Sequence, residues 1–169
     1  MEGLIRGPVI EKVIEMRSAG GMVDLSGNAE GFLFPADLRS IELRPEVNKI
    51  NLSKCSLIGG IPPFFGKISS ATELDLSHNS LSGSIPAYLS KLLKLQILRL
   101  NNNQLSGHIP AELSALSEMQ HFFAQCNNLS GDIPASFNDF KAIHTVSLNN
   151  NSFDGLLHLE IIALIFRYY

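Results

Sequence analysis

NSLSGSIP at residues 79–86 recurs as NQLSGHIP at 103–110 and as NNLSGDIP at 127–134. The three copies begin at residues 79, 103 and 127, so the period is 24 residues. One period upstream lies CSLIGGIP (55–62), and one period downstream lies NSFDGLLH (151–158), which keeps the asparagine and the glycine but loses Ile-Pro. A fixed period of this length indicates a chain built from stacked copies of one structural unit.

Apolar residues occupy the same positions in every copy of the unit. Before the asparagine position they alternate with polar residues, a pattern typical of a short strand with one buried face. One unit cannot fold alone, because its few apolar side chains do not offset the conformational entropy lost on ordering it. The units must therefore stack, with their strands side by side in one parallel sheet. The inward strand positions are Ile50, Leu52, Leu74, Leu76, Leu98, Leu100, Phe122, Ala124, Val146 and Leu148.

One position per unit marks the point where the strand ends and the chain turns inward. An asparagine amide there carries two donors and one acceptor, so it satisfies turn backbone groups that would otherwise be buried without partners. The glycine of the repeat permits a backbone conformation that other residues disfavour, and the proline ends strand pairing. We expect a structural ladder formed by Cys55, Asn79, Asn103, Asn127 and Asn151.

The repeat L-x-x-L-x-L-x-x-N-x-L-S-G-x-I-P resembles the plant-type leucine-rich repeats, over residues 22–157. These repeats occur in the ectodomains of receptor-like kinases and receptor-like proteins and in polygalacturonase-inhibiting proteins. The resemblance implies an α/β solenoid, a right-handed superhelix with a parallel β-sheet on the concave face and short helices or 3-10 turns on the convex side. It also implies a second short sheet at the SGxIP segment and ligand binding by the concave face.

The repeats divide the chain into an array and two ends. We expect the array over residues 22–157, with five clear units of 24 residues and one degenerate first unit. Residues 1–21 are expected to form an N-terminal helical cap, because segment 8–17 fits an amphipathic helix. Residues 158–169 leave the repeat and are strongly apolar, which indicates a C-terminal cap or a truncated end. The longest apolar stretch, 156–166, is too short to span a bilayer.

The strand alternation also predicts which side chains point outward on the concave face. Some of these positions carry apolar or aromatic side chains with an arginine nearby, a composition typical of binding hot spots, although single surface hydrophobes are common. Lys49 faces Glu73 and Asp75 faces Arg99, which predicts a solvated ion ladder of little stabilising value. The candidate partner-binding residues are Glu73, Asp75, Ile97, Arg99, His121, Phe123 and Gln125.

The residue pattern shows no reaction centre. His121 and His144 are near in register, but they occupy different positions of the repeat, and no carboxylate or thiolate lies beside them. Neither a metal site nor a cofactor is therefore predicted. Cys55 and Cys126 are expected about three strand spacings apart, or ~14 Å, too far for a disulfide. No nucleophile–base pair is visible, which predicts a protein that is not an enzyme. The net charge of −3 gives no basic excess for a nucleic-acid partner.

Three functions remain open. The family resemblance favours a non-catalytic module that binds a protein or peptide on the concave face, at the cell surface or outside the cell. The alternatives are a soluble inhibitor of cell-wall-degrading enzymes and an intracellular scaffold, and the absence of a signal peptide favours a cytoplasmic location. Candidate glycosylation sequons lie at Asn51, Asn128 and Asn150, and they have meaning only in a secretory pathway.

Overall fold

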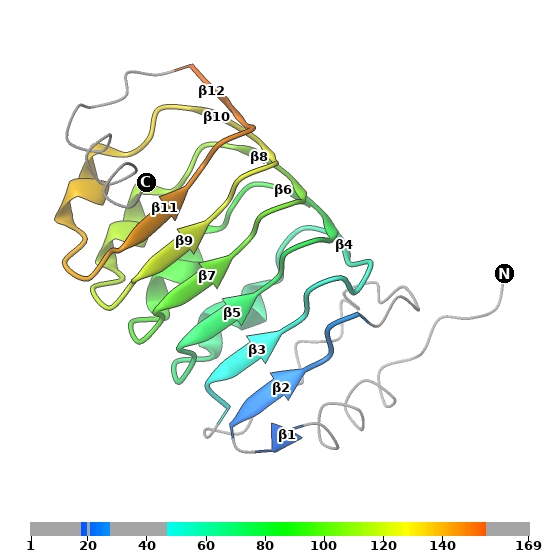
Figure 1. Cartoon of the computed structure of the whole chain (residues 1–169). Helices are drawn as coiled ribbons and strands as arrows, with labels where there is room; N and C mark the ends of the chain where they lie inside the picture. Colours follow the sequence, from blue (N-terminus) through cyan, green and yellow to red (C-terminus); the bar gives the residue numbers. More distant parts are fainter. Residues whose placement is uncertain (1–17, 20, 28–46, 155–169) are drawn as a thin grey trace, which may run out of the picture.

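The computed structural model describes residues 18–19, 21–27 and 47–154, which form a solenoid of stacked coils. Each complete coil contributes one strand to a large sheet, one strand to a small sheet and one 3-10 turn (Figure 1). The turns lie on the opposite side of the coil from the large sheet (Figure 1). This architecture confirms the α/β solenoid expected from the repeat.

Among the described residues, the large sheet contains seven strands in the order β1-β2-β3-β5-β7-β9-β11. From β2 onward, neighbouring strands pair in parallel. Equivalent positions face each other, for example Leu74 and Leu98, so every strand buries the same face. The strands are β1 (Ser18–Ala19), β2 (Met22–Asp24), β3 (Lys49–Asn51), β5 (Glu73–Asp75), β7 (Ile97–Arg99), β9 (His121–Phe123) and β11 (Thr145–Ser147).

The degenerate first unit joins this sheet in register. Val23 of β2 is buried and pairs with Ile50 of β3, despite the longer sequence separation between these two units. β1 pairs with β2 antiparallel, which adds a strand within the N-terminal stretch for which the sequence predicts a helical cap. The amphipathic segment 8–17 and the apolar end 158–169 lie outside the described residues.

The small sheet follows the asparagine position of each unit, in the order β12-β10-β8-β6-β4. The family resemblance placed it at the SGxIP segment, but four of its strands end at the repeat glycines Gly59, Gly83, Gly107 and Gly131. These glycines have φ values of 83°, 78°, 76° and 75°, which turn the chain out of the sheet before Ile-Pro. The strands are β4 (Ile58–Gly59), β6 (Ser80–Gly83), β8 (Gln104–Gly107), β10 (Asn128–Gly131) and β12 (Ser152–Phe153).

Each described 3-10 turn begins at the residue directly after the proline of the repeat. The turns are η2 (Pro63–Lys67), η3 (Ala87–Lys91), η4 (Ala111–Ala115) and η5 (Ala135–Asp139). Proline has a fixed φ and no N–H, so it suits the start of a helical turn. Each turn buries one large apolar side chain: Phe65, Leu89, Leu113 and Phe137.

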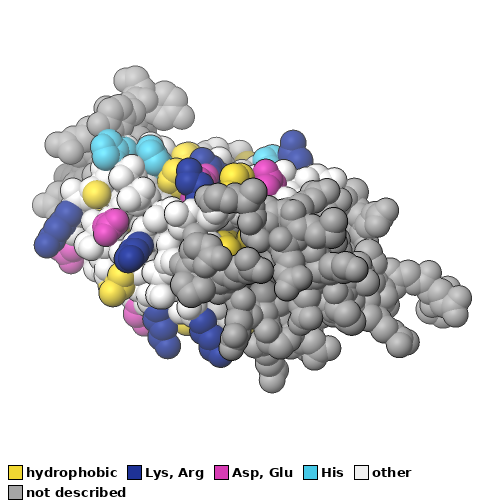
Figure 2. All heavy atoms as spheres, turned by 90° about the horizontal axis from the view of Figure 1, so that it is seen from below, with side chains coloured by type: hydrophobic (Ala, Val, Ile, Leu, Met, Phe, Trp, Pro, Cys, Tyr) yellow, Lys and Arg dark blue, Asp and Glu magenta, His cyan; other side chains and the backbone are white. Residues whose placement is uncertain are grey.

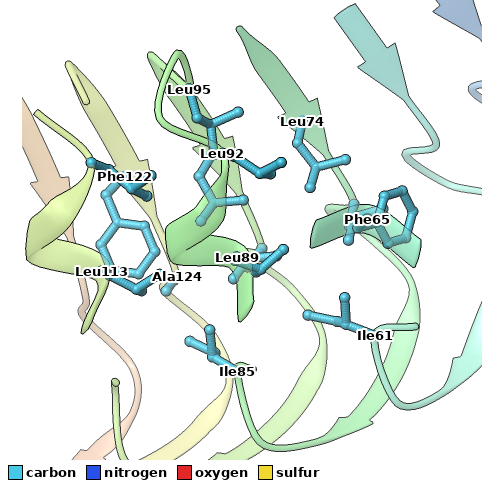
Figure 3. Close-up of a cluster of buried hydrophobic side chains, with 14 of the residues drawn as sticks. Ile61, Phe65, Leu74, Ile85, Leu89, Leu92, Leu95, Leu113, Phe122 and Ala124 are labelled. Atoms are coloured by element: carbon cyan, nitrogen blue, oxygen red, sulfur yellow. The ribbon is translucent and has the colours of Figure 1, made fainter. Parts of the chain in front are cut away.

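The inward side chains of successive coils form one continuous apolar core behind the large sheet (Figure 3). Where an inward position does not carry leucine, side-chain volume is redistributed between neighbouring inward positions. Phe122 fills the position that Leu98 holds one coil earlier, while the small Ala124 follows it, and both are fully buried. The Phe122 ring packs edge-on against Phe137, with 5.9 Å between centroids. A large residue at one inward position is thus offset by a small one at the next.

The asparagine positions form a ladder that ties each coil to the one before it. Asn103 Nδ2 donates to the Leu100 carbonyl of its own coil and to the Leu76 carbonyl of the preceding coil, both at 3.0 Å. Its Oδ1 accepts the Leu81 N–H at 3.0 Å. These bonds satisfy backbone groups that the turn would otherwise bury without partners. Equivalent contacts are made by Asn79, Asn127 and Asn151.

Cys55 fulfils part of the same role in its coil. Its Sγ donates to the Leu25 carbonyl of the preceding coil at 3.0 Å, as an asparagine Nδ2 does elsewhere in the ladder. A thiol is a weaker donor than an amide and a weaker acceptor than a carboxamide oxygen. We infer that the ladder is weakest between these two coils.

Replacing Asn103 by alanine should lower the free energy of unfolding by about 2–4 kcal/mol, because it leaves buried backbone groups of two coils without partners. Urea denaturation followed by circular dichroism measures the loss. The matched control is Gln104→Ala, which removes an exposed side chain at the next residue and should change stability by less than about 0.5 kcal/mol. Equal effects of the two substitutions would contradict the proposed importance of the ladder.

Candidate ligand-binding face

The outward side chains of the large sheet form what we call the strand face. Its first row, in register across the strands, is Met22, Lys49, Glu73, Ile97, His121 and Thr145. Its second row is Asp24, Asn51, Asp75, Arg99, Phe123 and Ser147. The two rows contain every predicted contact residue except Gln125, which follows the end of β9, and they add Met22 and Asp24. Sequence reasoning missed these two, although they flank the apolar Val23 that marks the first strand.

Oppositely charged side chains compensate one another over β3, β5 and β7. Lys49 Nζ lies 3.8 Å from Glu73 Oε2, and Arg99 Nη1 lies 3.9 Å from Asp75 Oδ2, so both expected pairs are present. Arg99 also donates to Glu73, which joins the two pairs into one network of two cations and two carboxylates. These side chains are 15% to 53% exposed. Solvent therefore screens the network, and it adds little to stability.

A group of rings adjoins this network on β9 and just before β11. The Phe123 and His121 rings are nearly parallel, at 8°, with 6.1 Å between centroids, and the His121 and His144 rings lie 5.9 Å apart. Arg99 Cζ lies 5.7 Å from the Phe123 centroid, within the range of a cation–π interaction. His121 Nδ1 lies 3.2 Å from Thr145 Oγ1. We call Phe123, His121 and His144 the ring cluster.

The ring cluster and the charged network are accessible from solvent. Each of their side chains is at least partly exposed. In Figure 2, histidine, hydrophobic and charged side chains follow one another along the upper edge of the view. The strand face therefore changes along the solenoid from charged to aromatic and imidazole character.

The neighbourhood of His121 opposes its protonation. Burial lowers the pKa of His121 below its ordinary value of 6.5, and the positive charges of a protonated His144 and of Arg99 lower it further. These surroundings therefore favour the neutral imidazole of His121 in the free protein.

Two of the predicted contact residues have a side-chain oxygen that is either bonded within the protein or buried. Asp75 Oδ1 accepts the Ser77 N–H at 2.9 Å and the Ser77 hydroxyl at 2.6 Å, which holds the chain at the end of β5. Gln125 Oε1 is buried and lacks a hydrogen-bond partner among the described residues. Neither oxygen is freely available to a ligand. The other predicted residues, Glu73, Ile97, Arg99, His121 and Phe123, are half-buried, as are Asp75 and Gln125.

The three sequons differ in their surroundings. Asn51 lies on the strand face, and its Oδ1 accepts the Ser53 N–H at 3.1 Å. Asn150 is exposed, and its Nδ2 donates to Cys126 Sγ at 3.4 Å. Asn128 is exposed in β10 of the small sheet. A glycan on Asn128 would therefore leave the strand face uncovered, whereas one on Asn51 would stand on it.

Other kinds of site find no support in the described part of the chain. Within residues 18–19, 21–27 and 47–154, no group of three or more histidine, cysteine, aspartate or glutamate side chains could hold a metal ion. No helix in these ranges has the length and apolar character needed to cross a bilayer. Cys55 is buried, Cys126 is half-buried, and no disulfide joins them.

Replacing His144 by glutamine should raise the pKa of His121 toward its ordinary value, because one repelling charge is removed. An NMR pH titration of the His121 Cε1–H resonance measures this shift. The control is His108→Gln, a histidine that the structure places outside the ring cluster, and it should leave the titration of His121 unchanged. A His121 pKa that does not respond to His144→Gln would show that the two imidazoles are not coupled.

Comparison with known proteins places the array in a family. A family model described as Leucine Rich Repeat matches residues 46–68, 70–92 and 94–116. No curated protein sequence matches the chain significantly. Solved structures, in contrast, match it at identities of 30% and above.

Plant receptors are prominent among these structures. The plant peptide hormone receptor RGFR1 in complex with RGF2 is 39% identical, with a TM-score of 0.67 over 70% of this chain and 19% of that chain. A TDR receptor is 33% identical, with a TM-score of 0.68 over 70% of this chain and 21% of that chain. The ectodomain of the receptor kinase SOBIR1 from Arabidopsis thaliana is 31% identical, with a TM-score of 0.63 over 68% of this chain and 62% of that chain.

This chain spans about a fifth of the length of the first two receptors. Within that span, the matched repeats, the parallel strands and the 3-10 turns agree with the same architecture. The chain is therefore a plant-type leucine-rich-repeat protein, and its described part is built like a segment of a plant receptor-kinase ectodomain.

Proposed function

We propose that this chain is a non-catalytic module that binds a peptide or protein ligand on the strand face, as part of a receptor-like ectodomain. The observation that carries the proposal is the half-exposed ring cluster with Arg99 beside it, on a sheet face where alternation leads us to expect ordinary polar side chains. Aromatic and arginine side chains supply much of the binding energy in protein interfaces. The similar receptor RGFR1 is described in complex with RGF2 as a peptide hormone receptor, which supports a peptide ligand.

The side chains of this face are restrained before any ligand arrives. Arg99 is positioned by two carboxylates and by the Phe123 ring, and His121 is positioned by Thr145 and by its neighbouring rings. The strands that carry them belong to one continuous sheet. A ligand would therefore lose little binding free energy to ordering the protein's side chains.

The location and the partner class have alternatives. The similarity to receptor ectodomains supports a place at the cell surface or outside the cell, and a cytoplasmic scaffold is the alternative. A soluble inhibitor of cell-wall-degrading enzymes would also be non-catalytic and would present the same fold. It would bind a folded enzyme rather than an extended peptide, so the size of the partner distinguishes the two functions.

Peptides selected from a displayed random library on the immobilised protein should bind the strand face. Phe123→Ala should raise their Kd at least tenfold, because it removes the aromatic area on which Arg99 and His121 pack. Fluorescence polarisation of labelled peptides measures the Kd. The control is Leu93→Ala, which removes an exposed hydrophobic side chain in the turn after η3, outside the strand face. Failure to select any peptide, or equal effects of both substitutions, would count against the proposal.

A secreted protein should carry a glycan at Asn128, where the sequon is exposed and the strand face stays open. In protein isolated from its natural source, treatment with an amidase specific for N-glycans should lower the mass of the peptide that contains Asn128. The substitutions Asn128→Gln and Ser130→Ala should remove the same glycan, since each destroys the sequon. An unmodified Asn128 in the natural protein would favour the cytoplasmic alternative.

A further inference from the structure

Positive charge at the charged end of the strand face is already compensated. Arg99 contacts Glu73 and lies near Asp75, while Lys49 lies near Glu73, so two cations face two carboxylates. A ligand carboxylate that approached Arg99 would also meet these two carboxylates, which repel it. Recognition of an anionic group is therefore disfavoured where the permanent cations lie.

The ring cluster offers a different source of positive charge. His121 and His144 lie side by side with 5.9 Å between ring centroids, and both keep exposed surface. Among the described residues, the titratable groups that act on His121 are Arg99 from β7 and His144 from the segment leading into β11. Thr145 of β11 adds a hydroxyl near Nδ1, and Phe123 of β9 adds an uncharged ring. The described part of the chain forms no ion pair between a carboxylate and either imidazole.

We infer that His121 and His144 form an anion-accepting subsite on the strand face, which binds a carboxylate side chain of the ligand when the imidazoles are protonated. The inference rests on the proposed function, because it names the ligand chemistry of the same face. The ligand is an acidic peptide that places an aspartate or glutamate at the ring cluster. Arg99 and Phe123 then contact the neighbouring part of the peptide.

The sign of the pH dependence follows from the charges around His121. In the free protein, burial, a protonated His144 and Arg99 all lower the pKa of His121, so they oppose proton uptake by this imidazole. A carboxylate bound against the two rings favours their charged forms and offsets their mutual repulsion. Binding therefore takes up protons, and by linkage the affinity for an acidic peptide rises as the pH falls below the ordinary range of histidine.

Paired peptides test this subsite. Peptides recovered from the displayed library are synthesised with acetylated and amidated ends, once with aspartate and once with asparagine at each acidic position. At pH 5.0 the best aspartate peptide should bind roughly tenfold or more tightly than the same peptide with asparagine. A hydrogen bond to a charged group has an effect of this size. At pH 7.5 the two Kd values should agree within about twofold, because a pH above the ordinary range of histidine disfavours the charged form that attracts a carboxylate.

Histidine variants assign the effect to its residues. His121→Gln with His144→Gln should remove the preference for aspartate at pH 5.0, and His144→Gln alone should reduce it. His108→Gln, which replaces an exposed histidine outside the ring cluster, should keep it. Melting temperatures compared across these variants verify that each one is folded.

The outcomes separate the two proposals. If peptides bind to the strand face but do not distinguish aspartate from asparagine at pH 5.0, the anion subsite is wrong and the binding function stands. The same holds if the preference survives in the double histidine variant. If the wild-type protein binds no peptide at either pH, both proposals are wrong.

Discussion

The hydrogen bonds of a buried asparagine side chain connect each coil of this solenoid to the coil before it. At the end of a strand the chain turns inward and leaves backbone N–H and carbonyl groups where water cannot reach them. In Asn103, one amide satisfies carbonyls of two successive coils and an N–H of the preceding one. The bonds require each asparagine to recur at the same height in every coil. That requirement keeps the ladder positions in register from coil to coil, whereas the apolar core accepts changes in side-chain volume.

A constant period has a direct consequence for the surface. Because every strand repeats the register of its neighbour, outward residues of successive units align in rows across the large sheet. The inward positions carry the stability of the array, so the outward positions are free to differ from unit to unit. Along the described coils they pass from a compensated group of charges to a cluster of aromatic and imidazole rings. The chemistry available to a ligand therefore depends on the unit that it contacts.

Several details departed from the expectations that the sequence supports. The small sheet ends at the repeat glycine instead of continuing through Ile-Pro, because a positive φ at glycine redirects the chain. Residues 18–19 form an antiparallel strand. The sequence does not predict this pairing, because two residues carry no periodic pattern. Asp75 holds a turn through Ser77, and Gln125 directs an oxygen inward, so both contribute less to the open face than their positions suggest.

The amino-acid sequence alone determined the solenoid, the ladder of asparagines, and the division of strand residues into buried and outward sets. Those features follow from alternation, spacing and the hydrogen-bonding groups of single side chains, which are properties of short segments. Only the tertiary structure decided which outward side chains meet. The contact of Arg99 with Glu73 and that of His121 with His144 join side chains of different coils. Their geometry depends on side-chain rotamers and on competition among neighbouring groups, and strand register by itself specifies neither.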